Sequence, residues 1–168
     1  MLPLTPLFII SQILMFISFG ITLVAFQLKK PSIFRIFFVV SSIFTAAHFI
    51  LLGAYTAAII VLISGSRWLA SLFTKQKIFI AIFMVLAVVA AILTWDSWIS
   101  LLPLAASLLG TLASFNTKEA HTRKILLGAT SLWILHNTLV FTPVGIFAEG
   151  VFLVSNTVGY LRNWRKKT

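Results

Sequence analysis

The chain has 168 residues, of which 60% are apolar and only 10% are charged, and its mean hydropathy is +1.09. Soluble domains carry about a quarter charged residues, so this composition excludes an ordinary soluble protein and indicates lipid as the surrounding solvent. The absence of cysteine excludes disulfides, thiol catalysis and cysteine metal sites. A net charge of +10 would suit a nucleic-acid partner, but the placement of the basic residues assigns them to cytoplasmic loops, so we expect no such partner.

Seven apolar runs follow one another along the chain. They cover residues 7–26, 36–53, 54–73, 78–95, 98–115, 125–141 and 144–160. Runs of about 17 to 20 residues are long enough for a helix to cross roughly 30 Å of hydrocarbon. Strands of a membrane barrel would be about ten residues long and would alternate apolar with polar side chains, which these runs do not. The first run has no basic segment before it and no small-residue cleavage site after it, so we expect a membrane span and not a cleaved signal peptide.

Turn-forming and aromatic residues mark several of the connections. Gly53 lies in an uncharged turn, and Pro143 parts the last two runs. Trp95 and Trp98 flank a turn that we expect at the membrane surface, because tryptophan favours the headgroup zone. Pro103 lies inside the fifth run, where it predicts a kink.

Basic residues occur in every second connection only. They follow the first, third, fifth and seventh runs: Lys29, Lys30 and Arg35; Lys75 and Lys77; Lys118, Arg123 and Lys124; and Arg162, Arg165, Lys166 and Lys167. The other connections and the N-terminal residues contain no lysine or arginine. Under the positive-inside rule this alternation predicts seven spans, with the N-terminus outside and the C-terminus in the cytoplasm of a bacterial inner membrane.

The second half of the chain repeats features of the first at offsets of about 88 residues. The segment Phe115-Asn116-Thr117-Lys118 echoes Phe26-Gln27-Leu28-Lys29, and His136 echoes His48. We therefore predict an all-α polytopic membrane protein of two parallel three-helix repeats joined by a linker helix, a 3+1+3 plan. The predicted units are residues 1–75, the linker 76–96, and residues 97–168 with their basic tail.

This plan resembles the SWEET and PQ-loop transporter superfamily and, more closely, the YgjV-type bacterial inner membrane proteins. The resemblance rests on Ser18-Phe19-Gly20, on Phe26-Gln27, on residues 48–54, on Ser64-Gly65-Ser66-Arg67 and on residues 155–159. It implies location and fold more than function. The chain departs from the PQ-loop pattern in having Phe26-Gln27 and Phe115-Asn116 where that pattern has Pro-Gln. Asn156 fits the asparagine that SWEET-like proteins place on a third helix, but no counterpart lies near Gly65.

Polar side chains inside apolar runs are costly in lipid and usually face the interior of a helix bundle. Two interpretations of the matched histidines stay open: pocket residues that bind a solute or protons, or neutral side chains that hydrogen-bond neighbouring helices. Arg67 stands near a helix end, and we expect it to reach the lipid phosphates. The candidate site residues are His48, Trp133, His136, Asn137, Glu149 and Asn156.

Glu149 and His136 lie at similar depth, within a few ångströms by helix rise, and would meet if both face the interior. A carboxylate beside an imidazole favours a charged pair that takes up a proton at mildly acidic pH. We hypothesise that this pair is a coupling or gating site, with Asn156 below it as a neutral ligand.

The sequence contains no acid–base couple, nucleophile cluster, zinc motif or nucleotide loop, so we expect neither an enzyme nor a cofactor or metal. The expected function is a small-solute transporter or facilitator that rocks two three-helix units around a midplane site. The alternative is a membrane sensor, receptor or lipid-binding accessory protein, because fold does not fix function. The expected partners are the lipid bilayer and a small polar solute, and a homo-oligomer stays open.

Overall fold

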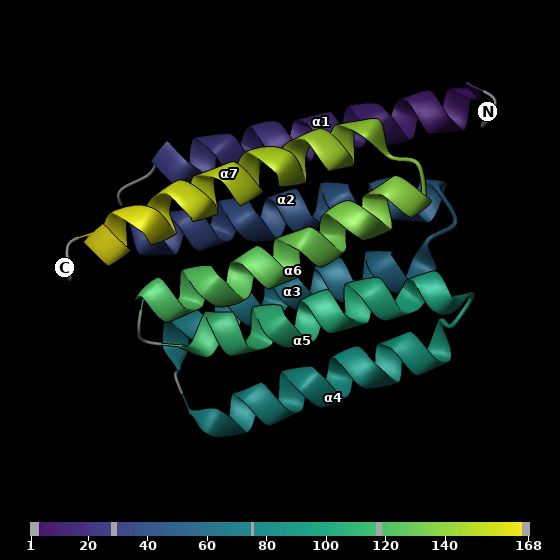
Figure 1. The fold of residues 1–168 in the computed structure, drawn as a ribbon. Coiled ribbons are helices and arrows are strands. Elements are labelled where there is room, and N and C mark those ends of the chain that lie inside the picture. The colour runs from purple at the N-terminus through teal and green to yellow at the C-terminus, as the bar shows by residue number, and fades with distance from the viewer. Residues whose placement is uncertain (1–3, 28–29, 75, 117–118, 166–168) are drawn as a thin grey trace.

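A computed structural model describes residues 4–27, 30–74, 76–116 and 119–165 of the chain. Within these residues the structure consists of helices joined by short connections (Figure 1). They are α1 (Pro6–Gln27), α2 (Pro31–Leu51), α3 (Tyr55–Phe73), α4 (Lys77–Leu93), a 3₁₀ turn (Trp98–Ser100), α5 (Leu101–Phe115), α6 (Glu119–Leu139) and α7 (Pro143–Arg165). The prediction of an all-α protein with seven helices is confirmed for this part of the chain.

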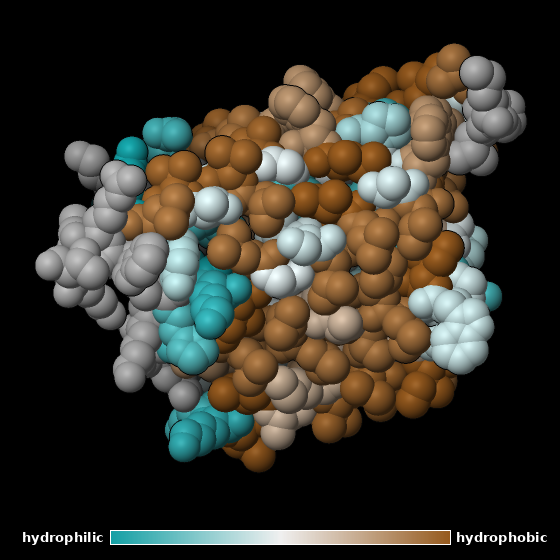
Figure 2. Space-filling view, in the orientation of Figure 1, coloured by the Kyte–Doolittle hydropathy of each residue, from teal (hydrophilic) through white to brown (hydrophobic). Residues whose placement is uncertain are grey.

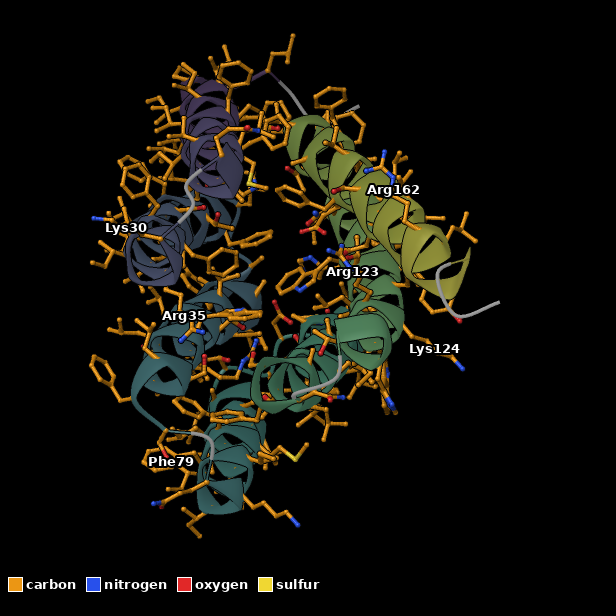
Figure 3. The ribbon with its side chains drawn as sticks, turned by 90° about the vertical axis from the view of Figure 1, so that its left-hand side faces the viewer. Lys30, Arg35, Phe79, Arg123, Lys124 and Arg162 are labelled. Carbon is orange, nitrogen blue, oxygen red and sulfur yellow. The ribbon has the colours of Figure 1, made fainter. Side chains whose placement is uncertain are left out.

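The helices lie side by side, and each packs mainly on its neighbours in the chain (Figures 1 and 3). α2 lies between α1 and α3, and α6 lies between α5 and α7. Contacts of α3 with α5 and of α1 with α7 join these two groups, while α4 packs on α5 and α3 at the edge. The two groups contain the same helices as the two predicted units. The superposition of the repeats, their parallel orientation and the unit boundaries stay predictions.

Four of the helical segments are long and apolar enough to cross a membrane: Pro6–Ala25, Tyr55–Phe73, Trp98–Phe115 and Pro143–Arg162. The apolar parts of α2 and α4, Arg35–Leu51 and Lys77–Leu93, are shorter. Apolar side chains cover the middle of the molecule in Figure 2, and large side chains of α4 such as Val85 and Ile92 are exposed. These features define a helical membrane protein with four spans by length and composition, and the crossing of the remaining helices stays a prediction.

Two helices begin earlier than the apolar runs predicted. α2 begins at Pro31 and includes Arg35, and α6 begins at Glu119 and includes Arg123 and Lys124, which the sequence had placed in a loop. The difference arises because a helix bonds its own backbone whatever its side chains are, so it continues past the apolar part of the chain. Proline is also well suited to the first turn of a helix, where α2 has it.

The kink expected at Pro103 stays a prediction. Pro103 is the third residue of α5, directly after the 3₁₀ turn, and its missing N–H therefore removes no bond from the helix interior. The predicted turns at Gly53 and before Pro143 are confirmed: Gly53 has a φ of 75°, which glycine adopts without strain, and α7 begins at Pro143.

Charged side chains gather at one end of the bundle, which we call the basic end. Figure 3 looks along the helices from this end, where Lys30, Arg35, Arg123, Lys124 and Arg162 are labelled. The opposite end, which we call the tryptophan end, carries Trp95 and Trp98 between α4 and α5, with ring centroids 5.5 Å apart. The predicted loop residues Lys29, Lys75, Lys118, Lys166 and Lys167 lie outside the described residues. Which end faces the cytoplasm stays a prediction.

Candidate functional site

A cavity of about 120 Å³, which we call the central cavity, lies between the two groups of helices. Side chains of α1, α2 and α3 form one wall, and side chains of α6 and α7 form the other. One water needs roughly 10–15 Å³ of such a space, so the central cavity has room for a solute of several heavy atoms.

The first wall of the central cavity is a network of hydroxyl groups. The Oγ of Ser18 lies 2.8 Å from the Oγ of Ser41 and 2.6 Å from the Oγ1 of Thr45, and the Oγ1 of Thr22 lies 2.7 Å from the Oγ of Ser41. Ser18 and Thr22 are four residues apart on α1, as are Ser41 and Thr45 on α2, so each pair occupies one helical face. The network joins α1 to α2 and places hydroxyl groups along this wall.

The second wall contains three of the six predicted site residues. Trp133 and Asn137, from α6, and Glu149, from α7, line the central cavity. Glu149 is the one charged side chain among the lining residues, and no hydrogen bond or ion pair within the described residues holds its carboxylate. Aromatic rings complete the lining: Phe19, Phe38, Phe49 and Phe152.

His48 is fully buried and is not among the residues that line the central cavity. Its Nδ1 lies 2.8 Å from the carbonyl oxygen of Ser11, and its Nε2 lies 3.0 Å from the Oγ1 of Thr142. Because a carbonyl oxygen only accepts, Nδ1 carries the proton, and the neutral ring accepts at Nε2 from the threonine hydroxyl. The geometry therefore fits the second interpretation of this histidine, in which it joins α1, α2 and the start of α7.

His136 lines a second cavity, of about 140 Å³, at the tryptophan end. Thr56, Asp96 and Ser100 also line this outer cavity, and Ser100 donates a hydrogen bond to the carboxylate of Asp96. The ring of His136 packs edge-on against Phe49 and Trp133, with centroids 5.4 and 5.6 Å apart. The two matched histidines thus have different surroundings.

The structure does not bring Glu149 and His136 together as the proton hypothesis required. Glu149 lines the central cavity and His136 lines the outer cavity, and no ion pair joins them. Asn137 lies between the two environments, since it lines the central cavity and its Oδ1 is 3.4 Å from the Nδ1 of His136. Asn156 lies two helical turns beyond Glu149 on α7, and it lines neither cavity. Glu149 and His136 therefore line different cavities, and their similar depth stays a prediction.

The expectation for Arg67 is wrong, because its side chain is only 3% exposed and lies between α3 and α5. Its Nε donates to the Oγ of Ser114 at 3.1 Å, and its Nη1 donates to the Oγ1 of Thr111 at 3.0 Å and to the carbonyl of Ser107 at 3.1 Å. The close approach depends on Gly110, where a Cβ atom would lie 2.7 Å from Nη2 of Arg67. Arg67 therefore joins the two groups of helices instead of reaching the lipid phosphates.

The sequence interpretation missed the hydroxyl residues of α1 and α5, although both sets leave a signal. Ser107, Thr111 and Ser114 lie four and three residues apart, which places their hydroxyls on one face of α5. The same spacing relates Ser18 to Thr22. Rows of small hydroxyl residues at helical spacing could have identified both the Arg67 contact and the contribution of α1 to the wall of the central cavity. Among the described residues, no group of histidine, aspartate and glutamate side chains has the arrangement of a metal site.

Fold and cavity together define a polytopic helical membrane protein with a small cavity of mixed polar and aromatic lining between two groups of helices. Comparison with known proteins gives the family: the family model for Imp-YgjV, described as bacterial inner membrane protein, matches residues 9–167. The chain belongs to this family. It is also 30% identical to the inner membrane protein YgjV of Escherichia coli (strain K12) over 149 residues, which cover 89% of this chain and 81% of the relative. No solved structure matches the chain, and the likeness to SWEET and PQ-loop proteins stays a resemblance.

Proposed function

We propose that the protein is a transporter or facilitator for a small polar solute in the bacterial inner membrane, with the central cavity as its binding site. The observation that carries the proposal is this cavity, which has hydroxyls on one wall and Asn137 and Glu149 on the other. Polar side chains in a membrane bundle mark solute or ion pathways more often than chance, because lipid makes them costly. Enzyme activity forms no part of the proposal.

The position of the central cavity supports transport over simple packing. Its walls come from two groups of helices that contact each other chiefly through α3 with α5 and α1 with α7. A site at the junction of two groups can be exposed to either side when one group moves against the other. Packing alone would favour filling such a space, because voids in a core are destabilising.

The proposal can be tested by filling the central cavity without disturbing the rest of α3. Ser64 lines the cavity, whereas Ser66 lies two residues further along the helix and is exposed. We expect Ser64→Phe to abolish the uptake of the transported solute into proteoliposomes, and Ser66→Phe to retain it. The solute is found first by comparing the uptake of a panel of small metabolites between a deletion strain and its parent.

Two outcomes would contradict transport. If the deletion changes the uptake of no compound in the panel but alters the envelope, the protein acts as a sensor or accessory protein instead. If Ser64→Phe and Ser66→Phe both retain full uptake of a solute that the purified protein carries, the path does not cross the central cavity.

A further inference from the structure

We infer that the central cavity binds a small organic cation, an ammonium ion of about four or five heavy atoms. The inference rests on the proposed function for its physiological meaning, but ligand binding can be measured whether or not the protein transports. Its basis is the combination of one unpaired carboxylate with aromatic and hydroxyl walls.

The charge of the lining residues favours a cationic ligand. Glu149 lines the central cavity without a cationic partner, and no lysine, arginine or histidine is among the lining residues. A carboxylate inside a membrane bundle is costly without a partner, so such groups are usually paired with a cation or face a polar cavity. Although the formal net charge of the chain is +10, the described residues supply no cation to the lining of this cavity, and we assign the position opposite Glu149 to a ligand.

The aromatic rings of the central cavity favour an ammonium group. Phe19, Phe49, Phe152 and Trp133 all line the central cavity together with Glu149. These rings contact one another in pairs. Phe19 packs on Phe152 with ring centroids 5.8 Å apart, and Phe49 stacks on Trp133, also at 5.8 Å. Ring faces attract ammonium groups, and the attraction grows when the site excludes water. An organic ammonium ion matches a lining that combines one carboxylate with several rings.

The hydroxyl wall offers hydrogen-bond partners to a second polar group on the ligand. Ser18, Thr22, Ser41 and Thr45 bond to one another, and a hydroxyl oxygen has two acceptor lone pairs, so the network can still bond to a polar group on the ligand. A ligand that places an ammonium group beside Glu149 and a hydroxyl group beside this network would bond to both walls. The volume of about 120 Å³ limits the ligand to a few heavy atoms.

The test compares two probes of equal size and different charge, ethanolammonium and 1-propanol, by calorimetric titration of the full chain in lipid nanodiscs. We expect ethanolammonium to bind at least about 30-fold more tightly than 1-propanol, and Glu149→Gln to remove that advantage. Glu149→Asp, which keeps the charge, should bind ethanolammonium more tightly than Glu149→Gln does. Asp96→Asn is the matched control, because it removes a carboxylate of the outer cavity, and it should retain wild-type affinity.

The inference is overturned if the two probes bind equally, if Glu149→Gln binds ethanolammonium as tightly as the wild type, or if potassium or sodium competes with it at equal concentration. A carboxylate that is merely protonated gives the second of these results. Two other outcomes separate this inference from the proposed function. Saturable ethanolammonium binding without uptake in proteoliposomes contradicts the proposed function alone. Uptake of a neutral solute without ammonium binding contradicts this inference alone.

Discussion

The contact between Gly110 and Arg67 gives the sharpest energetic test of how the two groups of helices are joined. Placing a methyl group on Gly110 would bring its Cβ to 2.7 Å from Nη2 and 3.4 Å from Cζ of Arg67. The guanidinium cannot withdraw freely, because hydrogen bonds from Nε and Nη1 hold it against α5. The substitution Gly110→Ala therefore forces this contact to shift.

Two effects of opposite sign set the magnitude. Alanine is more favourable than glycine in a helix by about 1 kcal/mol, and overpacking a well-filled contact costs about 1–3 kcal/mol. We expect Gly110→Ala to lower the free energy of unfolding by about 0–2 kcal/mol in the wild-type chain. In an Arg67→Met background the obstruction is gone, so the same change should stabilise the protein by up to about 1 kcal/mol.

The coupling energy between the two substitutions should therefore be about 1–3 kcal/mol, measured in a double-mutant cycle by detergent unfolding followed through tryptophan fluorescence. Gly20→Ala is the matched control, because nothing lies within 4 Å of a Cβ built there, and it should show no coupling to Arg67→Met. A coupling below about 0.5 kcal/mol for Gly110 would refute the reasoning, since independent sites add to within that margin.

Two further predictions follow from other contacts. Thr142→Val removes the hydroxyl 3.0 Å from Nε2 of His48 and leaves that buried nitrogen without a donor. The substitution should lower the free energy of unfolding by about 1–3 kcal/mol in the same assay. An unchanged unfolding curve would contradict the described bond. Because the chain lacks cysteine, single cysteines at Asp96 and Lys124 can report topology. An impermeant maleimide should label the first in intact spheroplasts and the second only after permeabilisation, and labelling of both from one side would defeat the predicted orientation.

The sequence predicted the helices well because their signal is local. Apolar runs of sufficient length and turn residues such as Gly53 and Pro143 depend on neighbours in the chain, and lipid allows few alternatives to a helix. The sequence did not predict that α2 begins at Pro31 and α6 at Glu119. Hydropathy reports which residues suit the membrane, and it does not report the hydrogen bonds that extend a helix beyond it.

The site was predicted in part, and the reason lies in side-chain direction. Trp133, Asn137 and Glu149 reach the central cavity, but His48 and His136, which the repeat placed at matching positions, face different neighbours. Depth along a helix follows from residue counting, whereas the direction of a side chain depends on how each helix is rotated in the bundle. That rotation is fixed by contacts between distant residues, such as Ser11 with His48, which no local pattern encodes.

The rings of Phe49, Trp133 and His136 separate the two cavities, and this arrangement leads to a last prediction. Phe49 and Trp133 line the central cavity, His136 lines the outer cavity, and the three rings contact one another. A solute that passes between the cavities must displace this layer, so Phe49→Leu should raise flux through a protein that transports. Phe83→Leu is the matched control, because Phe83 is also buried and packs on Phe115, whereas neither cavity contains it. Both variants lose a buried ring and should lose comparable stability. Only Phe49→Leu should accelerate equilibration of the solute in proteoliposomes, and equal flux through both variants would show that the ring layer is packing alone.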